Sequence, residues 1–136
     1  MEKYVLLKLA RTPGRVDFFK AHSEVIEQCG YVDFARISKG RICDRYLCGK
    51  TIFIKESKTQ GDRVFKAIVG EEIESGVNYP EYYNLIDISK AQWIRLKKLE
   101  IIDQEEFLKY YRLMNGKDLI GTFRGAVPWV FVQKSK

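Results

Sequence analysis

The alternation of apolar and polar side chains predicts that the chain begins with a strand, a helix and a second strand. Residues 4–9 form a short apolar run before a Thr-Pro-Gly breaker, as expected of a buried strand. From residue 17 to residue 29 the apolar side chains recur at helical spacing, and Gly30 can adopt the left-handed conformation that ends a helix. Residues 31–37 alternate and are rich in aromatic and β-branched side chains, which favours a strand.

The middle of the chain has the pattern of a β-hairpin followed by a long loop. Residues 51–54 and 64–69 are strand-like, and the Thr-Gln-Gly-Asp segment between them suits a turn. We therefore expect these two strands to pair antiparallel. Residues 71–84 are polar and contain glycine, proline and three tyrosines, which predicts a surface loop. The tyrosine-rich part, residues 79–83, is a candidate lid.

The last third of the chain predicts a long strand, a short helix and a closing strand. Residues 92–102 alternate, so that apolar side chains face one way while Trp93 and Arg95 face the other. An acidic capping box that begins at Asp103 predicts the short helix. Residues 129–132 have the composition of a final strand.

These elements predict an α+β fold in a single domain of residues 1–136. Strands outnumber helices and mostly lack crossover helices, so we expect a small curled mixed or antiparallel β pseudo-barrel with flanking helices. A length of 136 residues is typical of one domain. No stretch approaches the roughly 18 apolar residues of a membrane helix, and the chain does not begin with a signal-peptide pattern. We expect a cytoplasmic protein.

Few side chains could support catalysis or hold a metal. His22 is the only imidazole and falls at the edge of the predicted helix's apolar stripe, where a packed or capping histidine is expected. The three cysteines, Cys29, Cys43 and Cys48, complete neither a disulfide framework nor a zinc set and are expected to be free buried thiols. The chain has no glycine-rich phosphate loop and no nucleophile elbow. We expect no catalytic residue, no metal and no cofactor.

The positive charge of the chain is concentrated in one segment. The formal net charge is +6, and residues 36–66 hold nine basic side chains against three acidic ones, while the rest of the chain is balanced. Such a surplus attracts polyanions to one part of a surface. A solvated pair of strands whose lysines protect sheet edges is the other interpretation of this charge.

Aromatic side chains interleaved with arginine suggest a place where a nucleic-acid base could bind. A base can stack on an aromatic ring while neighbouring cations hold phosphates. Phe34 lies near Arg36, Trp93 near Arg95, and Trp129 near Arg124, although each ring could instead belong to the core. The predicted nucleic-acid-binding residues are Phe34, Arg36, Ser38, Lys39, Arg41, Arg45, Lys50, Trp93, Arg95, Arg124 and Trp129.

Four segments of the chain, residues 4–9, 31–37, 49–57 and 63–69, together resemble the PUA-like superfamily, specifically its EVE branch. The resemblance implies a small pseudo-barrel with flanking helices that holds a modified or extruded base of DNA or RNA in an aromatic-lined pocket. This chain differs from the usual EVE pattern at two positions. Lys50 follows Gly49 where the family usually has aspartate, and Phe34 stands where the family often has tryptophan.

Two other functions remain open at this point. The neighbouring ASCH branch includes small amidohydrolases, and a similar activity on a modified nucleoside would need Lys39 or Lys50 as the base with a carboxylate such as Glu56. The chain could also be a regulatory domain that binds a protein through the tyrosine-rich segment 79–83.

Overall fold

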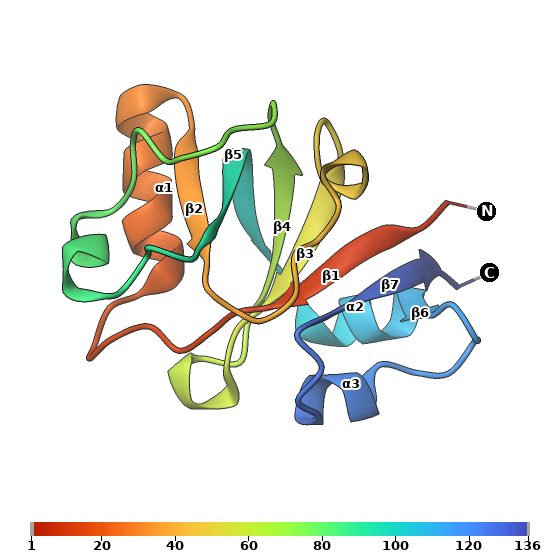
Figure 1. Cartoon of the computed structure of the whole chain (residues 1–136). Helices are drawn as coiled ribbons and strands as arrows, with labels where there is room; N and C mark the ends of the chain where they lie inside the picture. The colour runs from red at the N-terminus through yellow and green to blue at the C-terminus, as the bar shows by residue number, and fades with distance from the viewer. Residues whose placement is uncertain (1, 136) are drawn as a thin grey trace.

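The computed structural model describes residues 2–135 as a sheet with helices on both of its faces (Figure 1). Short 3₁₀ turns, η1 (Asp44–Tyr46), η2 (Lys58–Gln60) and η3 (Glu81–Leu85), lie in the connections. The regular elements in chain order are β1 (Tyr4–Lys8), α1 (Phe18–Cys29), β2 (Val32–Arg36), β3 (Thr51–Lys55), β4 (Val64–Val69), β5 (Gln92–Ile102), α2 (Gln104–Tyr110), β6 (Tyr111–Leu113), α3 (Ile120–Arg124) and β7 (Trp129–Lys134).

The strands form one mixed sheet in the order β2-β5-β4-β3-β1-β7-β6. β1 and β3 pair in parallel, and the other neighbours pair antiparallel, including the predicted β3–β4 hairpin. The parallel pair is possible because α1 and β2 lie between β1 and β3 in the sequence, which gives the chain the length to return in the same direction. The α+β class predicted from the sequence is confirmed.

The sheet is open, so the expected closure into a barrel does not occur. β2 and β6 are its two edges and do not pair with each other. The outer edge of β2 is occupied by the β4–β5 connection: Asp33 donates its N–H to the carbonyl of Asn78 at 2.7 Å, and Ala35 donates its N–H to the hydroxyl of Tyr83 at 3.1 Å. Because these donors are already satisfied, β2 has little left with which to bind another strand.

Two hydrophobic clusters hold the helices to the sheet. One gathers Phe18 of α1 with side chains of β1 to β5, and Val25 and Ile26 pack against it, as predicted. The other gathers Phe107 of α2 and Leu119, which precedes α3, with side chains that include Phe53. In Figure 1, α1 stands beside β2 while α2 and α3 lie near β7, at the other end of the sheet.

Local signals explain where the two longer helices begin and end. The side chain of Asp17 accepts a hydrogen bond from the N–H of Lys20, and Gly30 closes α1 with a φ of 83°. Asp103 caps α2 by accepting from the N–H of Glu106. The sequence predicts Gly30 at the end of α1 and the cap of α2 at Asp103, whereas the cap at Asp17 is seen in the structure alone.

Two short elements near the C-terminus are absent from the sequence-based prediction. β6 has only three residues and α3 only five, so neither shows a full hydrophobic period. Among residues 2–135, no helix has both the length and the apolar character needed to cross a membrane.

Candidate functional site

A small hollow lies between the segment that follows β1 and the segment that follows β2. It is lined by residues 8–13, residues 34–38, and Tyr82, Tyr83 and Ile86 of the β4–β5 connection. Its interior volume is about 20 Å³. We call it the β1–β2 hollow. The hollow is partly open to solvent, and its interior holds only about one water-sized group.

An open groove of about 380 Å³ adjoins the hollow. It shares Lys8, Leu9 and Ser38 with the hollow and is completed by Lys39 and residues 125–128. We call it the adjoining groove. The hollow and the groove together make a continuous concave surface on which basic side chains lie.

Lys8 fixes one wall of the adjoining groove. Its ammonium donates to the carbonyl of Thr122 at 2.9 Å and to the carbonyl of Gly125, and these bonds tie the end of α3 to β1. Burial lowers the pKa of Lys8, and the nearby ammonium of Lys55 lowers it further. Lys8 therefore has a structural role in addition to its contribution to the positive potential of the groove.

Arg36 is a buried cation at the β1–β2 hollow. Its side chain is 2% exposed. Nη1 donates to the carbonyl of Gly40 at 2.5 Å, and Nη2 donates to that of Lys39 at 3.2 Å. Within residues 2–135, no carboxylate forms an ion pair with Arg36. Burial lowers the pKa of this guanidinium, which reflects the cost of holding its charge away from water.

A chain of hydrogen bonds fixes the aromatic wall of the hollow. Nδ1 of His22 lies 2.8 Å from the carbonyl of Phe18 and must donate, because a carbonyl only accepts. Nε2 is then the acceptor for the hydroxyl of Tyr83, 2.5 Å away. The oxygen of Tyr83 in turn accepts the N–H of Ala35. The buried histidine that the sequence predicts thus holds η3 against α1 and β2.

We expect His22 to remain neutral in the folded protein down to acid pH. Burial lowers its pKa from 6.5 to about 4. The folded state therefore binds fewer protons than the unfolded state between these values, so stability that is present above pH 6.5 is lost as the pH falls to about 4, by about 3 kcal/mol. Because the chain has a single histidine, NMR can follow its ring signals without ambiguity.

The ring signals of the folded protein should not shift between pH 8 and pH 5. In urea the same signals should titrate near pH 6.5, which provides the control. A folded-state midpoint near 6.5 would contradict the buried, neutral histidine.

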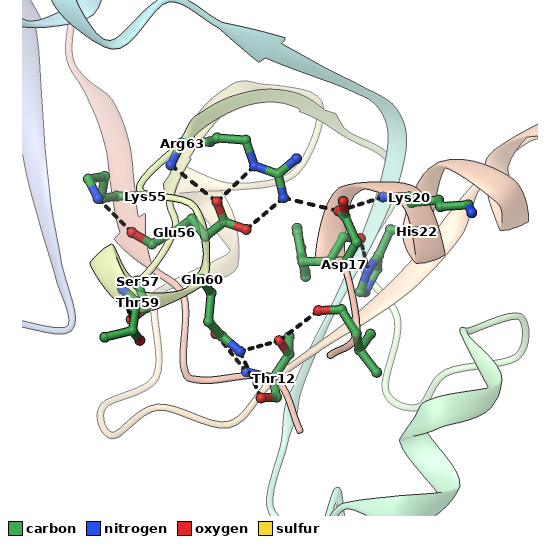
Figure 2. A network of polar contacts seen from close by, with 12 residues as sticks. Thr12, Asp17, Lys20, His22, Lys55, Glu56, Ser57, Thr59, Gln60 and Arg63 are labelled. Carbon is green, nitrogen blue, oxygen red and sulfur yellow. Dashed lines mark hydrogen bonds and ion pairs between the residues drawn. The ribbon is translucent and has the colours of Figure 1, made fainter. Parts of the chain in front are cut away.

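The opposite wall of the hollow is held by the tip of the β3–β4 hairpin. Figure 2 shows the side-chain amide of Gln60 facing Thr12. Gln60 accepts the N–H of Thr12 at 2.9 Å and donates to its carbonyl at 2.8 Å and to its hydroxyl at 2.6 Å. The side-chain amide thus exchanges a pair of hydrogen bonds with the backbone of Thr12, as a neighbouring β-strand would, and it positions the segment before α1.

A buried ion pair supports the same hairpin tip. Glu56 is 2% exposed, and its carboxylate accepts from the backbone N–H of Arg63 at 3.1 Å and from Nε and Nη2 at 2.8 Å each. Arg63 also reaches Asp17, the cap of α1, at 3.0 Å (Figure 2). The hydrogen bonds to Glu56 raise the pKa of Arg63. The hairpin tip and the start of α1 are thereby joined.

Four of the predicted binding residues come together at this site. Phe34 and Arg36 line the hollow, Lys39 lines the groove, and Ser38 lines both. The sequence-based set did not contain Lys8, Arg11 or Tyr82. Lys8 ends β1 and Arg11 follows it in the connection to α1, and no aromatic residue alternates with these two charges to mark them.

Trp93 and Arg95 lie elsewhere and hold the β4–β5 connection. The ring of Trp93 covers Gly76, where an added Cβ would come within 2.2 Å of the ring, and it packs 5.4 Å from the ring of Tyr79. Arg95 donates two hydrogen bonds to the buried carboxylate of Asp33, at 2.8 and 3.1 Å. Both side chains face away from the apolar neighbours Ile94 and Leu96 along β5, as predicted.

The remaining predicted residues are distributed over other parts of the surface. Trp129 is half-buried and packs edge-on against Phe131 at 5.2 Å. Arg41 pairs with Asp44, and Arg45 lies over the ring of Tyr46. Lys50 and Arg124 are exposed, and Arg124 borders a separate surface hollow near Phe123.

Part of the basic surplus in residues 36–66 is used inside the fold. Lys55 is 3% exposed and bonds to Asp62 and to the carbonyl of Glu56. Arg63 is held by Glu56 as described above. The charge that faces solvent in this segment is therefore smaller than the sequence count suggests.

Comparison of the chain with protein-family models, with curated proteins and with solved structures finds no match.

Proposed function

We propose that this protein binds unpaired nucleic acid, with the edge of one base at the β1–β2 hollow and the neighbouring backbone in the adjoining groove. The observation that carries this proposal is the buried guanidinium of Arg36, which has no acidic partner within residues 2–135. Buried charges are normally paired, so a ligand with electron-rich oxygens is favoured at this position.

The surroundings of Arg36 support a nucleotide as that ligand. Tyr82 at the hollow offers a half-buried ring beside which a base could lie. Arg11 at the hollow and Lys39 at the groove are exposed and have no ion-pair partner among the described residues. Cations in such positions can hold phosphates on either side of the base.

We also propose that the chain is a divergent member of the PUA-like superfamily, close to the EVE branch. The order of β1, α1 and β2 and the position of Phe34 beside a concave site support this assignment. In this chain the β4–β5 connection covers the edge of β2, where the family's pseudo-barrel would continue.

The geometry offers less support to the two alternatives. A hydrolase that uses Glu56 would need a free carboxylate, whereas Glu56 is buried and bonded to Arg63. A protein contact through the tyrosine-rich segment would need its rings at the surface. Tyr83 is buried, and Tyr79 stacks on it at 5.4 Å.

Reversing the charges at the site should weaken binding to single strands. The double variant Arg11→Glu/Lys39→Glu removes two cations that can contact phosphates. We expect an affinity loss of at least about tenfold for single-stranded DNA and RNA, and a salt slope of log K that is less steep by about 1 to 2 units. Fluorescence anisotropy with labelled oligonucleotides, at salt concentrations from about 25 to about 200 mM, measures both the affinity and the salt slope.

The matched control is Arg41→Glu/Arg45→Glu, which changes the net charge equally but lies around η1. We expect it to affect binding less, because these residues do not line the hollow or the groove. If the control variant loses more affinity than the site variant, the nucleic acid follows the surface around η1 and the proposed path is wrong.

A further inference from the structure

A separate concave region lies between the tip of the β3–β4 hairpin and the helices α2 and α3, and Figure 1 shows the hairpin tip and α3 at the same end of the molecule. It has a volume of about 390 Å³, and its lining residues lie within the ranges 58–62, 104–108 and 120–124. We call it the hairpin–helix hollow. Among the described residues, it shares none with the β1–β2 hollow or the adjoining groove. A volume of this size is typical of sites that bind small organic molecules.

Part of the hairpin–helix hollow is an apolar wall. Leu108 of α2 and Ile120 and Phe123 of α3 form this wall. Leu108 and Phe123 pack against the second hydrophobic cluster, and the ring of Phe123 stacks on that of the buried Phe107 with ring centres 6.2 Å apart. Ile120 is 48% exposed. The core beneath therefore holds the wall in place, and an apolar ligand group on it would bury exposed apolar surface.

The hairpin–helix hollow also carries unpaired positive charge. Lys58 of η2 and Arg124, the last residue of α3, line the hollow, are exposed, and form no ion pair among the described residues. Asp62 is the one carboxylate in the described lining, and it is already paired with the ammonium of Lys55. Two cations are thus left without an acidic partner, and they favour a ligand that brings a negative charge.

We propose that the hairpin–helix hollow binds a small organic anion that has one apolar part and one carboxylate. The apolar part lies on the wall formed by α2 and α3, and the carboxylate is held by Lys58 and Arg124. A purely apolar ligand would leave both cations without a partner, and an inorganic anion would leave the wall uncovered. This inference does not depend on the proposed function, because the two sites are lined by different residues.

A series of related probes tests both parts of the ligand. The probes are phenylbutyrate, phenylbutanol, which lacks the charge, and phenylbutylamine, which reverses it. We expect phenylbutyrate to bind the full chain with a Kd in about the millimolar range, and the alcohol to bind at least about fivefold more weakly. The amine should show no saturable binding. NMR titration of the isotope-labelled protein measures each Kd and shows whether the shifted backbone signals belong to the lining of the hollow.

Protein variants test the cations and the apolar wall separately. Lys58→Gln/Arg124→Gln removes two exposed charges and should weaken phenylbutyrate binding at least about fivefold while leaving phenylbutanol binding unchanged. The matched control is Lys97→Gln/Lys98→Gln, which removes two exposed charges on β5, outside the hollow, and should change neither affinity. Ile120→Ser reduces the apolar wall at a half-exposed position and should weaken the binding of both probes.

The inference is overturned if the acid, the alcohol and the amine bind with equal affinity, or if no signal from the lining of the hollow shifts to saturation. It is also overturned if an acidic amphipathic peptide binds there and phenylbutyrate does not, because the hollow would then serve a protein partner. Displacement of bound phenylbutyrate by a single-stranded oligonucleotide would make the hollow part of the nucleic-acid surface. The first three results leave the proposed function in place, because that function is tested through Arg11 and Lys39.

Discussion

Replacing Phe34 with alanine is expected to lower the free energy of unfolding by about 3 to 5 kcal/mol. Phe34 is 3% exposed and packs edge-on against Phe18 at 5.5 Å and against His22 at 5.8 Å. Truncation would leave a cavity between α1 and β2, where the packing on both sides is fixed by the sheet and the helix. Urea denaturation followed by circular dichroism measures the change.

The control for Phe34 is Trp129→Ala. Trp129 is only half-buried, so its removal should cost less, about 1 to 2 kcal/mol. A larger loss for Trp129 than for Phe34 would show that Phe34 is not a core residue. The comparison also matters for function, because Phe34 lines the β1–β2 hollow and a loss of binding in Phe34→Ala is meaningful only where the variant is folded.

Replacing Arg63 with methionine is expected to lower the free energy of unfolding by about 3 kcal/mol. The change leaves the carboxylate of Glu56, which is 2% exposed, with only the backbone N–H at position 63. Breaking a buried ion pair costs about 3 to 5 kcal/mol, and we expect the lower limit because Arg63 is itself 27% exposed. Thermal and urea denaturation measure the loss.

A double-mutant cycle distinguishes the ion pair from simple packing. Glu56→Gln in the Arg63→Met background should recover part of the lost stability, with a coupling energy of more than about 1 kcal/mol. Arg41→Met provides the surface control, because the pair of Arg41 with Asp44 is exposed and should contribute less than about 1 kcal/mol. A coupling energy near zero would mean that Glu56 does not depend on Arg63.

The network around Glu56 also bears on the proposed site. The hairpin tip that Arg63 stabilises carries Gln60, and Gln60 holds Thr12 at the wall of the hollow. Loss of Arg63 is therefore expected to loosen that wall before the sheet unfolds.

The longer local elements were determined by the sequence, whereas the short β6 and α3 were not. The bounds predicted for the long strand are those of β5, Asp103 begins α2 as predicted, and Gly30 ends α1 as predicted. Such signals act over a few residues through backbone hydrogen bonds and side-chain periodicity, so they do not depend on distant parts of the chain. The packed position of His22 followed from the same periodicity.

The grouping of the candidate residues was decided by the tertiary structure. In the sequence Phe34, Trp93 and Trp129 look equivalent, because each has an arginine nearby. In the structure Phe34 lines the hollow, Trp93 packs against the β4–β5 connection, and Trp129 lies on β7. Which ring meets solvent depends on the elements packed against it. Those contacts join residues far apart in the chain, and no local pattern encodes them.

The open sheet and the burial of Arg36 both depend on contacts between residues that are far apart in the chain. β2 pairs with β5 so that Arg36 lies opposite Gln92, and this pairing places a charged side chain inside the fold, where charged residues are rarely found. The outer edge of β2 is closed by backbone and hydroxyl groups of the β4–β5 connection, which arrive from more than 40 residues further along the chain. Several segments of the chain could accept hydrogen bonds from the outer N–H groups of β2. Only the folded structure shows that the β4–β5 connection does so.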